Sequence, residues 1–246
     1  MFGREKRCYI SPGGQYYKLF ADMAQQNHLL VAGETGSGKS VVINGIIATC
    51  LLHTPDKAGL ILIDPKRVEL SAYKNTPHCI TYASEPDEWI AALDLALTIT
   101  ERRYQEMQRD GSRLYSGGDI YVIIDELAYL MTMRKKEAVP RIQKLGMIAR
   151  AAKVHLLVCT QTVKADILPT TITCNFDSRV ALRTATAQQS RMILGVNGCE
   201  QLPMHGQGFF RTPAGTTLYK IPMYDENQLS QMVAYWTSTK CLYRVA

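Results

Sequence analysis

The chain has 246 residues, of which 46% are apolar and 20% charged, the balance of an ordinary globular protein. No apolar run approaches the ~20 residues that cross a bilayer, and the N-terminal segment lacks the apolar core of a secretory signal, so we expect a cytoplasmic protein. The formal net charge of +6 suits a polyanionic partner without requiring one. None of the seven cysteines form a C-x-x-C pair, which argues against a zinc site or a disulfide framework.

The first half of the chain alternates short apolar runs with helical patterns. His28 to Ala32 (HLLVA) predicts a strand that leads into a Gly-rich turn, and Lys39 to Leu52 predicts a buried helix. Leu60 to Asp64 (LILID) predicts a second strand, which Pro65 ends. Ser84 to Asp87 resembles a helix N-cap and opens a long helix that reaches at least Met107.

The second half continues the alternation. Strands are expected at Tyr121 to Asp125, Leu156 to Thr160 and Arg179 to Thr184, a hairpin within Phe209 to Pro222, and helices at about Val139 to Ala152 and Asp225 to Trp236. Buried strands with helices between them predict an α/β fold: a mainly parallel central sheet flanked by helices, plus a C-terminal β-hairpin, in a RecA-like architecture. We expect a single domain, with residues 1–27 as a lead-in, 28–225 as the core and 226–246 as a C-terminal helix and tail.

The strongest motif runs from Gly33 to Ser40 (GETGSGKS) and matches the phosphate-binding pattern G-x-x-x-x-G-K-[ST] in full. Its glycines allow backbone N–H groups to turn inwards around phosphate oxygens. Lys39 would reach the β- and γ-phosphates of ATP, and the Ser40 hydroxyl would bind Mg²⁺. The helix that begins there adds its positive dipole end. The predicted nucleotide-binding residues are Gly33, Glu34, Thr35, Gly36, Ser37, Gly38, Lys39, Ser40 and Val41.

A second motif, Tyr121 to Glu126 (YVIIDE), is an apolar strand that ends in two carboxylates, the arrangement called Walker B. Asp125 would hold Mg²⁺, directly or through water, and Glu126 would act as general base on the attacking water. Asp-Glu pairs are common at strand ends, so this motif is a strong indication only in combination with the P-loop that precedes it. A carboxylate next to the metal ligand suits the activation of water, which predicts an ATP hydrolase and not a kinase.

The strand from Leu156 ends in Thr160 and Gln161, two polar residues. A polar side chain at that position could contact the γ-phosphate and report whether it is present. The alternative is a loop residue whose hydrogen bonds are satisfied locally. With two nucleotide motifs already placed, we favour Gln161 as a sensor of the γ-phosphate.

Taken together, these segments resemble the motor domain of the FtsK/SpoIIIE family of DNA translocases, over about residues 15 to 225. The matching stretches are His28 to Ser40, Asp64 to Tyr73 (DPKRVELSAY), Thr76 to His78, Val122 to Met131 (VIIDELAYLM), Ala149 to Gln161 and Gly206 to Phe210. The DPKRVEL segment is far more specific than the P-loop alone. The resemblance implies a RecA-like fold, a ring of six subunits around double-stranded DNA, and ATP hydrolysis coupled to translocation.

The resemblance also implies roles for single residues. The family's Walker lysine, magnesium serine, Walker B carboxylates and sensor glutamine fall on Lys39, Ser40, Asp125, Glu126 and Gln161. Its arginine finger falls on Arg150, which would enter the site of a neighbouring subunit and offset charge on the γ-phosphate. A finger is useless in a monomer, so a homo-oligomer is implied. A solvated surface arginine is the alternative for Arg150, and Arg179 is the reserve candidate for the finger.

Candidates for contact with DNA phosphates are Arg191, which matches a family arginine associated with DNA, together with Lys164 and Arg183. The chain departs from the family pattern at Thr162 and Ala187, where the family often has a basic residue. A solvated surface is the alternative for each basic residue.

The leading hypothesis is an ATP-dependent translocase of double-stranded DNA, serving transfer of chromosome, plasmid or mobile-element DNA. One alternative is the ATPase motor of a type VII-like protein secretion system, and another is a nucleotide-dependent scaffold, which the intact Lys39, Asp125 and Glu126 argue against. Membrane association would come through a membrane-anchored or secretion-channel partner or through an N-terminal region outside this chain. Either the chain is an excised domain or it is a compact relative of the larger family members.

Overall fold

A mixed, mainly parallel β-sheet runs through the protein. The computed structural model describes residues 14–53, 57–221 and 226–238, and in these residues eight strands form one sheet in the order β3-β2-β4-β5-β1-β6-β7-β8. The strands are β1 (His28–Ala32), β2 (Ala58–Ile63), β3 (Cys79–Ala83), β4 (Asp119–Ile124), β5 (Val154–Thr160), β6 (Ser178–Ala181), β7 (Gln207–Thr212) and β8 (Gly215–Lys220). Strands β1 to β6 pair in parallel, and β7 and β8 add an antiparallel hairpin at the β6 edge.

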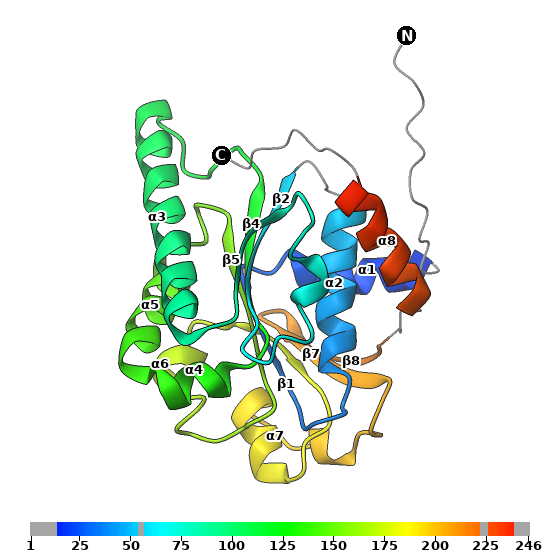
Figure 1. The fold of residues 1–246 in the computed structure, drawn as a ribbon. Helices are drawn as coiled ribbons and strands as arrows, with labels where there is room; N and C mark the ends of the chain where they lie inside the picture. The colour runs from blue at the N-terminus through cyan, green and yellow to red at the C-terminus, as the bar shows by residue number, and fades with distance from the viewer. Residues whose placement is uncertain (1–13, 54–56, 222–225, 239–246) are drawn as a thin grey trace.

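Helices cover both faces of this sheet (Figure 1). One face carries α1 (Gly14–Ala24), α2 (Lys39–His53) and α8 (Glu226–Ser238). The other carries α3 (Pro86–Asp110), α4 (Leu127–Met133), α5 (Lys135–Ile148), α6 (Thr170–Thr173) and α7 (Ala187–Leu194). Two short 3-10 helices, η2 (Ser71–Tyr73) and η3 (Cys199–Gln201), lie in connecting loops. The sheet therefore has a separate apolar core on each side.

The central strands are buried along their whole length. Every residue of β1, β2 and β5 is buried, and in β2 Ile61 and Ile63 join one core while Leu60 and Leu62 join the other. Strands covered by helices on both faces need such continuous apolar runs. This requirement explains why HLLVA, LILID and YVIID were recognisable in the sequence.

Two features fix the flanking helices. Helix α3 begins with a capping box, in which the Glu88 carboxylate accepts from the backbone N–H of Glu85, and it ends at Gly111 in the left-handed region with φ 64°. Helix α2 passes so close to α1 that a Cβ built on Gly45 would lie 2.4 Å from Cζ of the buried Phe20. A glycine is needed at residue 45 because no side chain fits there.

The predicted fold class is confirmed, with shifts of one to three residues at most strand ends. Strand β6 differs more: it covers Ser178–Ala181, whereas Arg179 to Thr184 was expected, because the chain leaves the sheet after Leu182 to pass over the P-loop. The helix expected at Val139 to Ala152 starts earlier and ends at Ile148. Pro222 and Asp225, the expected end of the hairpin and start of the last helix, lie outside the described residues. The sequence did not predict α1, β3, α4, α6 or α7.

Candidate active site

The P-loop connects β1 to α2 at the carboxyl edge of the parallel strands. Gly36 and Gly38 adopt φ values of 78° and 102°, which side chains with a Cβ rarely adopt. Gly33 is required for space, since a Cβ there would lie 2.7 Å from both Leu182 Cβ and Ser37 Oγ. The loop ends at the N-terminus of α2, a 15-residue helix whose positive end faces the loop. The backbone thus has the glycines and the helix end that a phosphate cradle needs.

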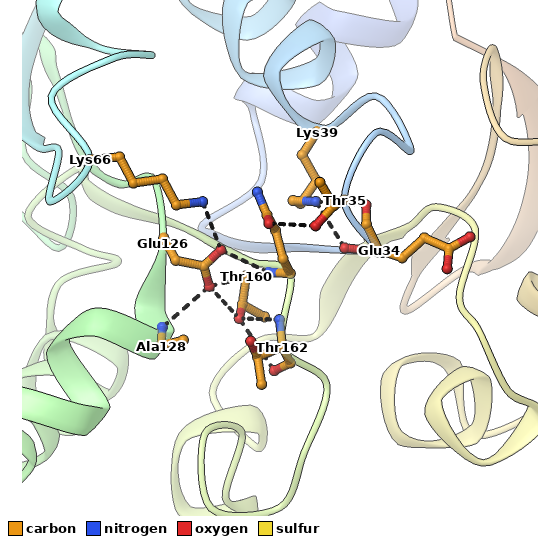
Figure 2. Close-up of polar contacts among 10 residues, drawn as sticks. Glu34, Thr35, Lys39, Lys66, Glu126, Ala128, Thr160 and Thr162 are labelled. Carbon is orange, nitrogen blue, oxygen red and sulfur yellow. Dashed lines mark hydrogen bonds and ion pairs between the residues drawn. The ribbon is translucent and has the colours of Figure 1, made fainter.

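Lys39 is the first residue of α2 and folds back onto its own loop. Its Nζ donates to the carbonyls of Gly33 at 2.8 Å and Glu34 at 3.0 Å (Figure 2). The side chain is only 7% exposed, and burial lowers the pKa of Lys39, a shift that the negative charge of Glu126 opposes. The ammonium group is therefore held inside the loop by neutral carbonyls, which a phosphate could replace with a charged partner.

Asp125 directly follows β4, and its backbone N–H donates to Ile63 O at 3.1 Å. Its side chain is 6% exposed, and Oδ2 has no hydrogen-bond partner among the described residues. Burial raises the pKa of Asp125 to about 7, and the positive charge of Lys66 offsets part of that rise. A buried carboxylate with an open oxygen is stabilised by a cation, so Asp125 suits a metal ligand.

Glu126 is the N-cap of α4 and accepts hydrogen bonds from four donors (Figure 2). Thr160 Oγ1 donates to Oε1 at 2.8 Å and Ala128 N to Oε1 at 3.3 Å, while Gln161 N donates to Oε1 at 3.2 Å and to Oε2 at 3.1 Å. Lys66 Nζ lies 3.3 Å from Oε2 and forms an ion pair with it. The carboxylate is thereby fixed in position at the end of β4.

The sheet order brings Gln161 between the two motifs, because β5 lies between β4 and β1. The backbone N–H of Gln161 donates to Glu126, while its side-chain Oε1 accepts from Thr35 Oγ1 of the P-loop at 2.8 Å. Gln161 thus contacts both the Walker B carboxylate and the phosphate loop. Lys39, Glu126 and Gln161 come from three separate strand ends and meet at one edge of the sheet.

Arg150 lies at the opposite edge of the sheet. It precedes β5, whose Leu156 pairs with His28 at the start of β1, whereas the P-loop follows the end of β1. Arg150 is exposed and lines a cavity of about 510 Å³ with His28, Met147 and Asn175. The reserve candidate Arg179 instead donates to the carbonyls of Phe176, Ile193 and Thr173. Arg150 is therefore exposed, whereas the guanidinium of Arg179 is held by three carbonyls of its own chain.

The three basic residues considered for DNA have different surroundings. Arg191 is exposed on α7 and donates to Asn197 Oδ1 at 2.6 Å, and Lys164 is exposed in the loop after β5. Arg183 bonds to Glu34 Oε1 at 2.8 Å and to Leu202 O at 2.7 Å. Since those bonds brace the P-loop, Arg183 is less suited to hold DNA than Arg191 is.

Lys66 and Thr160 contact Glu126 directly. No role for Lys66 was predicted from the sequence, which indicated Thr160 only as part of the polar pair with Gln161. Lys66 lies in the DPKRVEL segment, just after β2, and β2 is the parallel neighbour of β4. The carboxyl ends of adjacent parallel strands share one edge of the sheet, so this topology could have pointed to Lys66. Pairing of β2 with β4 was not evident from either strand alone.

Three further observations concern metal-binding clusters, membrane-spanning helices and cysteines. No cluster of three or more His, Cys, Asp and Glu side chains in the described ranges is arranged to hold a metal by itself. Within those same ranges, none of the helices combines the length and the hydropathy of a membrane span. Cys50, Cys159 and Cys199 are buried, where a cysteine side chain packs as a small apolar group.

Two solved structures of other proteins have a fold similar to that of this chain. A solved structure of the pCW3 conjugation coupling protein TcpA, in its monomer form with ATPgS, is similar with a TM-score of 0.75 at 22% identity, over 87% of this chain and 66% of that one. The cytoplasmic domain of the type VII secretion ATPase EccC of Thermomonospora curvata gives a TM-score of 0.68 at 21% identity, over 87% of this chain and 28% of that one. These two likenesses show the P-loop ATPase fold.

Some proteins share more sequence identity with this chain than these two solved structures do. The DNA translocase FtsK of Rickettsia bellii is 34% identical over 266 residues, which cover 90% of this chain and 36% of that protein. This chain thus spans about a third of the length of that relative. The model of the FtsK/SpoIIIE family matches residues 12–197. The chain belongs to the FtsK/SpoIIIE family of P-loop ATPases.

Proposed function

We propose that this chain is the motor of an ATP-dependent translocase of double-stranded DNA, which hydrolyses ATP in a ring-shaped oligomer. The observation that carries the proposal is the meeting of Lys39, Asp125, Glu126 and Gln161 at one sheet edge in a member of the FtsK/SpoIIIE family. The event served would be transfer of chromosome, plasmid or mobile-element DNA.

The residues present fit a nucleotide with Mg²⁺. Asp125 has an open, buried oxygen, and Ser40 lies at the start of α2, so these two would hold the ion together with phosphate oxygens. When bound, Mg²⁺ neutralises charge on the phosphates. Lys39 would leave the carbonyls of Gly33 and Glu34 and bind the β- and γ-phosphates. These changes give each buried charged group a partner.

Hydrolysis would be completed by Glu126 and Gln161. Glu126 would accept a proton from the attacking water, since its carboxylate is fixed at the end of β4 by Thr160 and by the backbone of Gln161. The Gln161 side chain, which accepts a hydrogen bond from Thr35 in the P-loop, would respond to the γ-phosphate. Both residues would act within the subunit that binds the ATP.

Arg150 supports the proposal of a ring. It lies at the far edge of the sheet from the P-loop of its own subunit, so it could serve as a finger only in a neighbouring subunit. A contact between two different faces of the same chain repeats head to tail and closes into a ring, here proposed to be a hexamer.

DNA is favoured over protein as the substrate because of the sequence relatives. The relative at 34% identity is named a DNA translocase, whereas the secretion ATPase EccC is similar in fold at 21% identity. Arg191 and Lys164 are the proposed phosphate contacts, since both are exposed basic side chains. The protein secretion motor remains the second candidate, supported only by the shared fold.

Steady-state ATPase rate with and without long double-stranded DNA tests the proposal. We expect stimulation at low salt that fades as salt rises, because contacts to phosphate release counterions. Arg191→Ala and Lys164→Ala should each weaken the stimulation without changing the rate in the absence of DNA. ATP hydrolysis that DNA leaves unchanged, while a secretion substrate stimulates it, would replace the proposal with the protein motor. Absence of hydrolysis under both conditions would favour a scaffold.

A further inference from the structure

Lys66 is a second lysine in the nucleotide site. It is the third residue after the end of β2, and its Nζ lies 3.3 Å from Glu126 Oε2. The Lys66 side chain is 26% exposed, whereas that of Glu126 is 4% exposed. In Figure 2 Lys66 points from its loop towards Glu126, on the side of the site that faces Lys39 and Thr35. One partner of this ion pair is therefore fixed, and the other can reach solvent.

The hydrogen bonds of Glu126 leave no open position for water. A carboxylate offers about four lone-pair sites, two on each oxygen. Thr160 Oγ1 and Ala128 N donate to Oε1, Lys66 Nζ donates to Oε2, and the N–H of Gln161 is shared between Oε1 at 3.2 Å and Oε2 at 3.1 Å. A general base needs one lone pair directed at the water it deprotonates. In this arrangement Glu126 cannot act until one donor leaves.

Lys66 is the donor that can leave. Ala128 N and Gln161 N are backbone groups at the ends of regular elements, so moving them would disturb the fold. The hydroxyl of Thr160, which is buried in β5, contacts Oε1 and not Oε2. The loop that carries Lys66 is itself pinned, because Asp64 Oδ2 accepts from Leu70 N at 3.0 Å. A pinned backbone under a long, flexible side chain allows the ammonium group to move alone.

The same ammonium group is close enough to the phosphate site to respond to it. Its positive charge acts on both Lys39 and Asp125, lowering the pKa of each. A triphosphate next to Lys39 would therefore compete with Glu126 for Lys66, and it offers more negative charge than one carboxylate does.

We propose that Lys66 senses the terminal phosphate: it occupies Glu126 Oε2 when no triphosphate is bound, and moves to the γ-phosphate of ATP, which opens Oε2 to the attacking water. This inference rests on the proposed ATPase function. It adds no covalent step, since the ammonium group of Lys66 only exchanges one partner for another. A lysine that served stability alone would bind Glu126 equally with ATP, with ADP and without nucleotide.

Equilibrium binding of ATPγS and of ADP to the full chain, each with Mg²⁺, separates these two roles. We expect Lys66→Met to weaken ATPγS binding about tenfold, as expected for loss of a charged hydrogen bond, and to leave ADP binding within about twofold. Lys66→Arg should keep most of the preference for ATPγS. Lys74→Met, an exposed lysine of the same connecting segment, should bind both nucleotides like the parent.

A double-mutant cycle with Glu126→Gln tests the exchange itself. Loss of the Glu126 charge frees Lys66, so Glu126→Gln should tighten ATPγS binding several-fold more in the parent than in the Lys66→Met background. Repulsion between Glu126 and phosphate alone would give the same gain in both backgrounds, and that result would overturn the inference. Equal weakening of ATPγS and ADP by Lys66→Met would overturn it as well. A parent that binds ATPγS but shows either result leaves the proposed ATPase standing, whereas a parent that binds no ATPγS would remove both.

Discussion

Asp125→Asn should stabilise the nucleotide-free protein at pH 8 while it abolishes Mg²⁺-dependent hydrolysis. Burial raises the pKa of Asp125 from 3.8 to about 7, so the ionised carboxylate costs stability when no cation is bound. Between these two pH values the folded state binds more protons than the unfolded state, so the free energy of unfolding falls as pH rises. The Asn variant lacks this dependence and should gain on the parent across the same window.

The size of the gain follows from the pKa. A rise from 3.8 to about 7 corresponds to about 4 kcal/mol, at about 1.36 kcal/mol for each pH unit. The amide nitrogen of Asn would lack a partner at the position of Oδ2, which costs about 1–3 kcal/mol. We therefore expect a net gain of about 2 kcal/mol at pH 8, or about 4–8 °C in melting temperature for a chain of this size.

Thermal unfolding of parent and variant at a series of pH values from 5 to 8 measures this effect. The difference between them should grow with pH and level off above about pH 7. Mg²⁺ with ADP should reduce the difference in stability between parent and variant, because a cation stabilises the carboxylate of the parent and not the amide of the variant. A difference that stays constant from pH 5 to pH 8, or a variant that melts below the parent at pH 8, would refute the reasoning.

Three further predictions concern other parts of the chain. Glu126→Gln should bind ATP but turn it over at least about 100-fold more slowly, and nucleotide release as fast as in the parent would rule out Glu126 as the base. Arg150→Ala should bind ATP normally and hydrolyse it poorly; mixed with Lys39→Ala subunits it should regain turnover, and mixtures that stay inactive would count against a finger acting in trans. Gly45→Ala should destabilise the protein by about 1–3 kcal/mol in urea unfolding, because its Cβ would meet Phe20 2.4 Å away, and an unchanged midpoint would contradict that packing.

The sequence predicted the buried centre of the fold better than its margins. Strands β1, β2, β4 and β5 are apolar on both faces, so their composition alone marked them. Strand β3 (CITYA) is a half-buried edge strand without that signal, and α4 is only seven residues long. The structure of such elements depends on contacts with the rest of the fold, so it cannot be predicted well from their own residues.

The candidate site shows the same division. The P-loop and the Asp125–Glu126 pair are local patterns, and their strand, turn and helix context could be predicted directly. The contact between Lys66 and Glu126 depends on β2 lying beside β4, and the contact between Thr35 and Gln161 depends on β5 lying beside β1. Pairings between strands far apart in the chain decide which side chains meet, and one sequence does not specify them.

Strand β5 joins two parts of the protein that belong to different ATP sites in the proposed ring. Arg150 lies four residues before its first residue, and Gln161 directly follows its last. All seven residues of β5 are buried, with hydrogen-bonded strands on both sides, so we expect β5 to be stiff along its length. If Arg150 is the finger that we propose, a shift at the Gln161 end, caused by the phosphates of one subunit, would be transmitted along β5 towards Arg150 and so to the next subunit. The displacement of this one strand would then determine the order in which the subunits of the ring hydrolyse ATP.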